Sequence, residues 1–370
     1  MTKSDNPFLA LTAPGIPGLT PYRPGKPISE LERELGISDS IKLASNENPL
    51  GPSPRVAAAI AAALLELGRY PDGAGFALRG ALAERHGVSP EAITLGNGSN
   101  DCLDMIARTF LQPGTESLFS AHAFAVYPIA TQAVGATARI APARDYGHDL
   151  AAMASLVSDK TRVVWIANPN NPTGTWLGAD ALRAFLTGLP RTCVAVVDEA
   201  YIEYVAEPDY PDTSRWLADL PNLIVTRTFS KAHGLAGLRV GYALSDPAIA
   251  DLLNRVRQPF NVNSLAQEAA LASLADPEHI ERHVAMNRAG LEQLAEGCRR
   301  LGLDHIPSVA NFLMVDMGRP AAPIDEALQR EGCIVRPVAN YGLPNHLRIT
   351  VGLEAENARL LAALERVLER

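Results

Sequence analysis

The sequence predicts an α/β fold, in which helices flank a mostly parallel seven-stranded sheet in a large domain and a smaller α+β domain follows. Short runs rich in Val, Ile and Leu alternate with helical or turn segments through the first two thirds of the chain, a pattern typical of βαβ units. After residue 262 the pattern changes to long helices with few strands. A length of 370 residues also suggests two domains.

The N-terminal segment reads as an extended arm. Its prolines are Pro7, Pro14, Pro17, Pro21, Pro24 and Pro27. Because this spacing forbids a helix, we expect residues 1–40 to form an arm that packs on the small domain or on a partner subunit. A short helix is expected over 29–35. The large domain is then predicted at 41–262 and the small domain at 263–370.

The large domain follows from its order of elements. Helices are expected at 54–67, 77–86 and 101–111, and Pro54 suits a first helical turn. The apolar stripe of 57–65 is expected to face the core. The predicted strands are 93–96, 116–120, 138–141, 162–167, 192–197, 223–226 and 238–244.

The small domain is expected to begin with helices. Residues 263–302 have a helical pattern in which Asp276 is the N-cap and Pro277 the first helical residue. Strands are predicted at 311–316, 334–336 and 347–351, and helices at 324–331 and from 354 onward.

Composition excludes several functional classes. The net charge of −8 and the lack of a long Lys/Arg run argue against nucleic acid and acidic membranes as partners. We expect a cytoplasmic protein, because no leader-like segment and no apolar run long enough to span a membrane is present. The four cysteines lie far apart, and His279 and His283 read as a solvated helix face. We therefore expect no metal site and no disulfide.

Lys231 is the first candidate for chemistry. It follows the apolar run of the strand predicted at 223–226, within a loop of small residues. Partial loss of water and a nearby cation lower the pKa of such a lysine and free its amine to attack a carbonyl. The alternative is an ordinary solvated loop lysine.

Asp198 is the second candidate. It comes directly after the apolar strand predicted at 192–197, where an unpaired carboxylate is costly to bury. A protonated ring nitrogen is a natural partner, because a carboxylate keeps such a ring charged. A structural N-cap for the following segment is the alternative.

Two loops follow other predicted strands. Residues 96–101 form a glycine turn before a helix, where backbone N–H groups suit an anion and Arg239 can add charge. Residues 168–174 form a Pro- and Asn-rich loop whose amides can reach a ring hydroxyl, or simply a connection. Parallel strands end at one edge of a sheet, so these signals predict one ligand site there.

These residues lie within motifs that resemble the histidinol-phosphate aminotransferase family of fold-type-I pyridoxal-phosphate (PLP) enzymes, from about residue 41 to 352. The matching motifs are LASNENP at 43–49, RYP at 69–71, GNGS at 96–99, NNPTG at 170–174, DEAY at 198–201, TFSK at 228–231, GLAGLR at 234–239, VRP at 335–337 and LRIT at 347–350.

The resemblance implies a role for each matching residue. Lys231 is implied as the catalytic residue that bonds the cofactor and carries a proton. Cofactor contacts are implied for Ser99, Asn100, Phe124, Asn171, Asp198, Tyr201, Ser230, Lys231, Arg239 and, from a partner subunit, Tyr70. Substrate contacts are implied for Asn46, Tyr70, Asn311, Arg336 and Arg348. A homodimer with shared sites is therefore expected.

The implied reaction is amino transfer between L-histidinol phosphate and 2-oxoglutarate, a step of histidine biosynthesis. Phe124 stands where the family often has tyrosine over the cofactor ring; it can stack but cannot donate a hydrogen bond. Together with the segment 338–344, this leaves an aromatic amino acid such as phenylalanine as the alternative substrate. A non-catalytic binding protein of the same fold is a more distant alternative. Such proteins usually carry an added DNA-binding module, and no helix-turn-helix pattern is present here.

Overall fold

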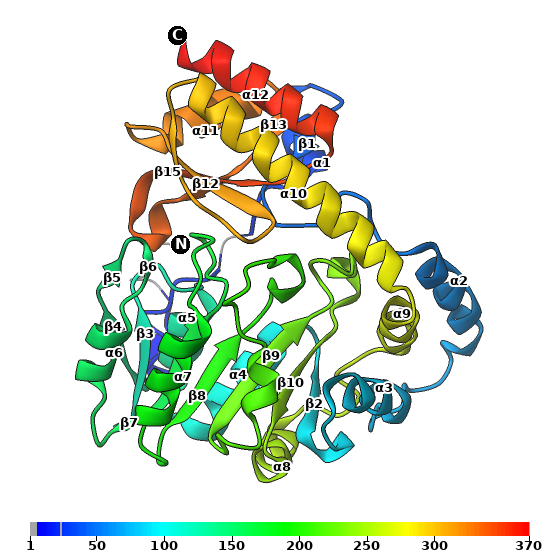
Figure 1. Cartoon of the computed structure of the whole chain (residues 1–370), viewed down its shortest axis with the longest axis vertical. Coiled ribbons are helices and arrows are strands. Elements are labelled where there is room, and N and C mark those ends of the chain that lie inside the picture. Colours follow the sequence, from blue (N-terminus) through cyan, green and yellow to red (C-terminus); the bar gives the residue numbers. More distant parts are fainter. Residues whose placement is uncertain (1–5, 23, 370) are drawn as a thin grey trace.

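The computed structural model describes residues 6–22 and 24–369, and it has a larger and a smaller part (Figure 1). The larger part holds a central sheet with helices around it. The smaller part holds a second sheet, covered by helices from the C-terminal third of the chain (Figure 1). The long helix α10 (Pro277–Arg300) runs from one part to the other (Figure 1).

The central sheet is mostly parallel, as predicted. Within the described residues it has seven strands in the order β2-β10-β9-β8-β7-β3-β4, and only β10 runs antiparallel to its neighbours. The strands are β2 (Ile93–Gly96), β3 (Glu116–Ser120), β4 (Thr137–Ala141), β7 (Thr161–Ala167), β8 (Val194–Asp198), β9 (Leu223–Thr228) and β10 (Gly241–Ser245). The carboxyl ends of β2, β7, β8 and β9 therefore share one edge.

Helices cover both faces of this sheet. They are α2 (Pro54–Ala63), α3 (Phe76–His86), α4 (Ser99–Phe110), α5 (Val126–Ala133), α6 (Leu150–Leu156), α7 (Ala179–Gly188), α8 (Pro247–Val256) and α9 (Ser264–Leu274). Alternate residues of β7 belong to different hydrophobic clusters: Val164 to one, and Val163 and Trp165 to the other. Because successive strand residues point to opposite faces, the sheet is buried on both sides.

The smaller part is built around an antiparallel sheet. In the described chain this sheet has four strands, β11 (Asp304–Ile306), β12 (Phe312–Asp316), β15 (Leu343–Thr350) and β14 (Arg336–Val338). Helices α10, α11 (Ala321–Arg330) and α12 (Glu354–Leu368) share a hydrophobic cluster with it. Asp276 caps α10 by accepting from the His279 N–H, and Pro277 follows as predicted.

The packing does not agree with the predicted limits of the large domain, either at residue 41 or at residue 262. Strand β1 (Ile41–Lys42) pairs with β13 (Cys333–Ile334), so residue 41 belongs to the smaller part. Helix α9 packs on α2 and α3, and its Ala266 and Ala270 are buried in a cluster of the larger part. A helical pattern does not reveal which neighbour buries its apolar face, so the boundary at 262 was set too early.

The arm contacts both parts of the molecule. Gln132 of α5 donates to the carbonyl of Gly15 at 3.0 Å. Helix α1 (Ile28–Leu35) then buries Leu31 against Ala44 and Ile334. The arm therefore crosses the larger part before it reaches the smaller one.

Two expectations about surfaces were wrong. The apolar stripe at 57–65 is largely exposed, and Leu65 is 86% accessible. His279 and His283, expected to face solvent, are buried: they bond the Gly51 carbonyl and the Tyr204 hydroxyl, respectively. Helical periodicity alone shows that one face is apolar or polar, but not what covers it.

The close approach of β10 to the turn after β2 gives a stability prediction. A Cβ at Gly241 would meet the Ser99 backbone nitrogen, and would lie 2.9 Å from the Arg227 carbonyl oxygen. Because these atoms are backbone, we expect Gly241→Ala to lower the free energy of unfolding by about 1–3 kcal/mol in urea titrations.

Gly80 is the matched control for this change. It lies inside α3 with open space around it, so Gly80→Ala should leave stability unchanged or raise it by about 0.5–1 kcal/mol. Equal effects of the two alanines would contradict the packing explanation.

Candidate active site

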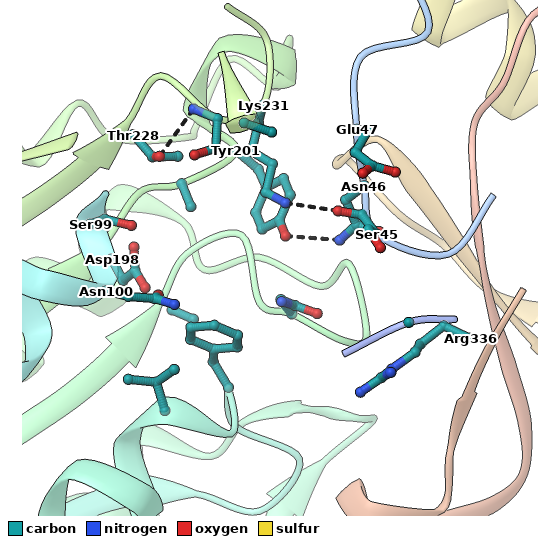
Figure 2. A pocket seen from close by; sticks show the side chains of 18 of the residues that line it. Ser45, Asn46, Glu47, Ser99, Asn100, Asp198, Tyr201, Thr228, Lys231 and Arg336 are labelled. Atoms are coloured by element: carbon teal, nitrogen blue, oxygen red, sulfur yellow. Dashed lines mark hydrogen bonds between the residues drawn. The ribbon is translucent and has the colours of Figure 1, made fainter. Parts of the chain in front are cut away.

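A pocket of ≈270 Å³ lies where the parallel strands end, and residues of both the larger and the smaller part line it. The larger part contributes the residues that follow β2, β7, β8 and β9. The segment 45–47 and Arg336 close it from the other side (Figure 2). Ala44 and Arg348 also line it. The four signals that the sequence placed at strand ends therefore meet in one cavity.

Lys231 lies in the loop after β9, and its amine points across the pocket (Figure 2). Nζ donates to the Ser45 carbonyl oxygen at 3.0 Å and lies 5.8 Å from the centre of the Tyr201 ring. Burial lowers the pKa of Lys231 to about 7, and the nearby Arg348 acts in the same direction. At neutral pH a large fraction of this amine is therefore unprotonated and nucleophilic.

Asp198 ends β8, and its carboxylate is only 5% exposed. Burial raises the pKa of Asp198 to about 6, while hydroxyl donors to the carboxylate act in the opposite direction. One donor is Thr226, at 3.0 Å. A buried carboxylate of this kind is stabilised by a cationic partner, because charge without a partner is costly in such surroundings.

The turn after β2 has the geometry of an anion site. Gly98 has a φ of 80°, and α4 begins at Ser99, so the first N–H groups of the helix face the pocket side. The Arg239 guanidinium lies directly against Gly98, where a Cβ would collide with it. Arg239 also donates to the Ser230 hydroxyl at 3.2 Å. The backbone N–H donors at the start of α4 and the Arg239 cation therefore lie close together, as an anion site requires.

Arg348 is buried on β15 and bridges the two sides of the pocket. It donates to the Asn171 side chain at 2.6 Å and to the Ala44 carbonyl at 2.7 Å. Among the described residues its Nε has no hydrogen-bond partner, and burial lowers the pKa of its guanidinium. An anionic ligand would relieve this buried positive charge.

Arg336 also lines the pocket (Figure 2). It pairs with Arg348 in the register of β14 and β15 and is the more accessible of the two. Its guanidinium lies 5.6 Å from the ring centre of Tyr22, a residue of the arm. The pocket therefore has two arginines at different depths.

Asn46 joins the segment 43–48 to both parts of the molecule. Its Nδ2 donates to the Tyr201 hydroxyl at 2.9 Å, and its backbone N–H donates to the Thr350 hydroxyl at 2.9 Å. Asn311 does not line the pocket as predicted. It donates to the Asn46 carbonyl at 3.0 Å and so supports Asn46 from behind.

Most of the residues singled out in the sequence line this pocket. They are Asn46, Ser99, Asn100, Phe124, Asn171, Asp198, Tyr201, Ser230, Lys231, Arg239, Arg336 and Arg348. Tyr70 does not: it is 83% exposed and stacks on Phe260, with 4.7 Å between ring centres. Within one chain, Tyr70 therefore lies outside the site.

Several residues at the site had not been singled out. Tyr127 donates to Asp198 at 3.0 Å, and Tyr22 and Glu47 line the pocket. Glu47 pairs with Lys42 at 2.8 Å. Only Glu47 had a signal, as part of the motif at 43–49; the other contacts join segments far apart in the chain.

These residues fit the cofactor that the sequence resemblance implies. A buried carboxylate suits a pyridinium nitrogen, a lysine with a lowered pKa suits an aldehyde, and the turn at 96–100 with Arg239 suits a phosphate. No cluster of three or more His, Cys, Asp or Glu side chains in 6–22 and 24–369 could hold a metal ion. No helix of those residues is long and apolar enough to cross a membrane.

Comparisons with known proteins agree with this geometry. Residues 38–364 match the family model described as aminotransferase class I and II. Histidinol-phosphate aminotransferase 2 of Pseudomonas fluorescens is 61% identical, over 98% of this chain and 99% of that protein. The protein of that name from Pseudomonas aeruginosa is 59% identical, over 98% of each chain.

Solved structures have the same fold. The histidinol-phosphate aminotransferase of Sinorhizobium meliloti, in complex with pyridoxal-5′-phosphate, has a TM-score of 0.89 at 32% identity and covers 96% of this chain and 97% of its own. The aspartate aminotransferase of Thermus thermophilus with maleate has a TM-score of 0.83 at 21% identity, and covers 96% of this chain and 99% of its own. The second comparison supports the fold alone.

The lowered pKa of Lys231 predicts its reactivity in the cofactor-free protein. Because the group loses its proton as pH rises through about 7, its rate of acylation by a neutral reagent should rise with a midpoint near that pH. A lysine peptide, with a pKa of about 10.4, serves as the reference. Peptide mass spectrometry can follow Lys231 separately.

Arg348→Gln tests the cause of this shift. Removal of the nearby cation should move the midpoint for Lys231 to higher pH. If Lys231 of the unsubstituted protein had a midpoint close to that of the reference peptide, the burial of its amine would be contradicted.

Proposed function

The chain belongs to the class I and II aminotransferase family, and from this we propose that it transfers an amino group between L-histidinol phosphate and 2-oxoglutarate with PLP as its cofactor. One observation carries the proposal: Lys231 and Asp198 face one pocket that also contains two arginines. When bound, PLP supplies an aldehyde that reacts with amines and a ring that withdraws electrons from the substrate's α-carbon.

Lys231 has two tasks in this reaction. Its unprotonated amine would hold the cofactor through the aldehyde, and the same amine would be placed to hold or move a proton at the substrate α-carbon. The Ser45 carbonyl, 3.0 Å from Nζ, is a ready acceptor for the released amine.

Other residues orient the cofactor. Asp198 would keep the ring nitrogen charged, and Phe124 would stack on the ring. Tyr201 and Asn171 would bond the ring hydroxyl. Ser99, Asn100, Ser230 and Arg239 would hold the phosphate at the start of α4, where backbone N–H groups favour an anion.

The two arginines suit both substrates. L-Histidinol phosphate carries a phosphate and 2-oxoglutarate carries two carboxylates, and a guanidinium can bind either group through two N–H donors. The identity of 61% with a protein named for the first substrate supports this assignment. Asn46, held by Asn311, contributes polar groups beside Lys231.

An aromatic amino acid such as phenylalanine is the second candidate amino donor. Phe124 and Tyr22 add aromatic surface to the pocket, and an amino-acid carboxylate would pair with Arg348.

The four cysteines are free and buried, which suits the reducing cytoplasm where we propose that the enzyme works.

Absorbance of the purified protein should identify both cofactor and donor. We expect a visible band that bleaches on addition of L-histidinol phosphate, with a kcat/KM more than about tenfold above that for L-phenylalanine, about 1.4 kcal/mol of transition-state preference. Lys231→Ala should abolish turnover, whereas Lys160→Ala, at an exposed turn, should not. A preference for phenylalanine would overturn the substrate assignment.

We also propose that the enzyme is a homodimer whose active sites are shared. Leu64, Leu65, Leu67 and Tyr70 expose large apolar surface on the larger part. Contiguous exposed apolar surface is typical of protein interfaces. Tyr70 would then reach the phosphate site of the partner subunit, as the family resemblance implies.

Subunit mixing tests the shared site. Lys231→Ala and Tyr70→Ala homodimers should both have low activity, but unfolding and refolding them together should restore about a quarter of the normal activity. Half of the dimers are then mixed, and each mixed dimer has one intact site. Activity no higher than the average of the two variants would argue that each site is formed by one chain.

A further inference from the structure

Tyr127 makes a contact that the proposed function has not used. Its hydroxyl donates to Oδ2 of Asp198 at 3.0 Å, while Thr226 donates to Oδ1 at 3.0 Å. All three side chains are buried, and Tyr127 and Thr226 have no exposed surface. Each carboxylate oxygen of Asp198 thus has a hydroxyl donor.

The two donors have different origins. Thr226 lies directly opposite Asp198 in the register of β8 and β9, so its bond follows from the pairing of the strands. Tyr127 comes from outside the sheet, from α5. Its contact with Asp198 is therefore not required by the sheet itself.

Packing holds the Tyr127 ring in place. It stacks on Trp165 of β7, with ring centres 5.2 Å apart and planes 8° from parallel. It also makes a T-shaped contact with Phe124, with ring centres 5.8 Å apart. One side chain thus contacts the residue proposed for the face of the cofactor ring and the residue proposed for its nitrogen.

Burial and hydrogen bonding have opposite effects on the pKa of Asp198. Burial raises the pKa of Asp198 to about 6, and the bonds from Tyr127 and Thr226 act to lower it, because they stabilise the charged form. Burial also raises the pKa of Tyr127, so its hydroxyl stays protonated and remains a donor at neutral pH.

We propose that Tyr127 is a positioning residue that keeps the Asp198 carboxylate ionised and oriented toward the ring nitrogen of the cofactor. The inference rests on the proposed function, since it assumes PLP in this pocket. Tyr127 touches neither cofactor nor substrate and acts through Asp198. Its hydroxyl therefore matters only for a ring that carries a nitrogen.

The test uses the full-length protein, freed of cofactor and titrated with PLP from pH 5.5 to 8.5 by fluorescence. Tyr127→Phe should weaken binding about tenfold to a hundredfold near pH 7, the range expected for a hydrogen bond to a charged group. Without the hydroxyl Asp198 takes up a proton at higher pH, so the loss of affinity on acidification should begin at higher pH.

Two controls separate positioning from folding. Tyr204→Phe also removes a buried hydroxyl, but Tyr204 does not line the pocket, and its hydroxyl bonds His283 at 2.9 Å. This variant should leave PLP affinity unchanged. Thr226→Val removes the other donor to Asp198, and should weaken binding in the same direction even if Tyr127→Phe folds poorly.

An analogue of the cofactor gives the sharpest comparison. The 1-deaza form of PLP has carbon in place of the ring nitrogen but keeps its aldehyde and phosphate, so Lys231 reacts with both compounds alike. Tyr127→Phe should bind it about as well as the unsubstituted protein does. An equal loss of affinity for PLP and for the analogue, or no loss for either, would overturn the inference.

The unsubstituted protein separates this inference from the proposed function. If it binds PLP and turns over an amino donor, the proposed function stands whatever the Tyr127 variant does. If it does not bind PLP, both the function and the inference are overturned.

Discussion

The site depends on the removal of two opposite charges from water. Lys231 and Asp198 lie at the ends of neighbouring strands, and burial acts on both: it lowers the pKa of the amine to about 7 and raises that of the carboxyl to about 6. Near neutral pH a large fraction of the amine is therefore neutral, whereas most of the carboxyl is still ionised. A ligand that offers an aldehyde to the amine and a ring cation to the carboxylate would satisfy both, which explains why an aldehyde-bearing pyridine suits this pocket.

The sheet separates the hydrophobic core from the polar site. In parallel strands that are buried on both faces, apolar side chains such as Val164 and Trp165 supply the core on either side. Polar residues can then gather beyond the last residue of each strand, where backbone groups are free to bind a ligand. The smaller part covers this edge with Arg348 and the segment 43–48.

The sequence alone was sufficient for the parts of the site that have a local signal. Lys231 and Asp198 each follow an apolar run, and the turn at 96–101 follows another, so their meeting at one edge could be predicted. Arg348 has no such signal and was identified only through the family resemblance. Tyr127 was missed because its partner Asp198 is 71 residues away, and the short helix α5 gives no sign of which way its side chains point.

The assignment of α9 and β1 to a domain was wrong for a similar reason, because a local pattern describes an element but not its neighbour.

The segment 43–48 has two sets of attachments. The Leu43 N–H donates to the Ile334 carbonyl, and the Leu43 carbonyl accepts from the Thr350 N–H, both in the smaller part. The Ser45 carbonyl accepts from the Lys231 amine of the larger part. The amine that we propose bonds the cofactor therefore also links the two parts through this hydrogen bond. When Lys231 is engaged elsewhere this hydrogen bond is absent, so the chemical state of a single nitrogen atom decides whether this link between the two parts exists.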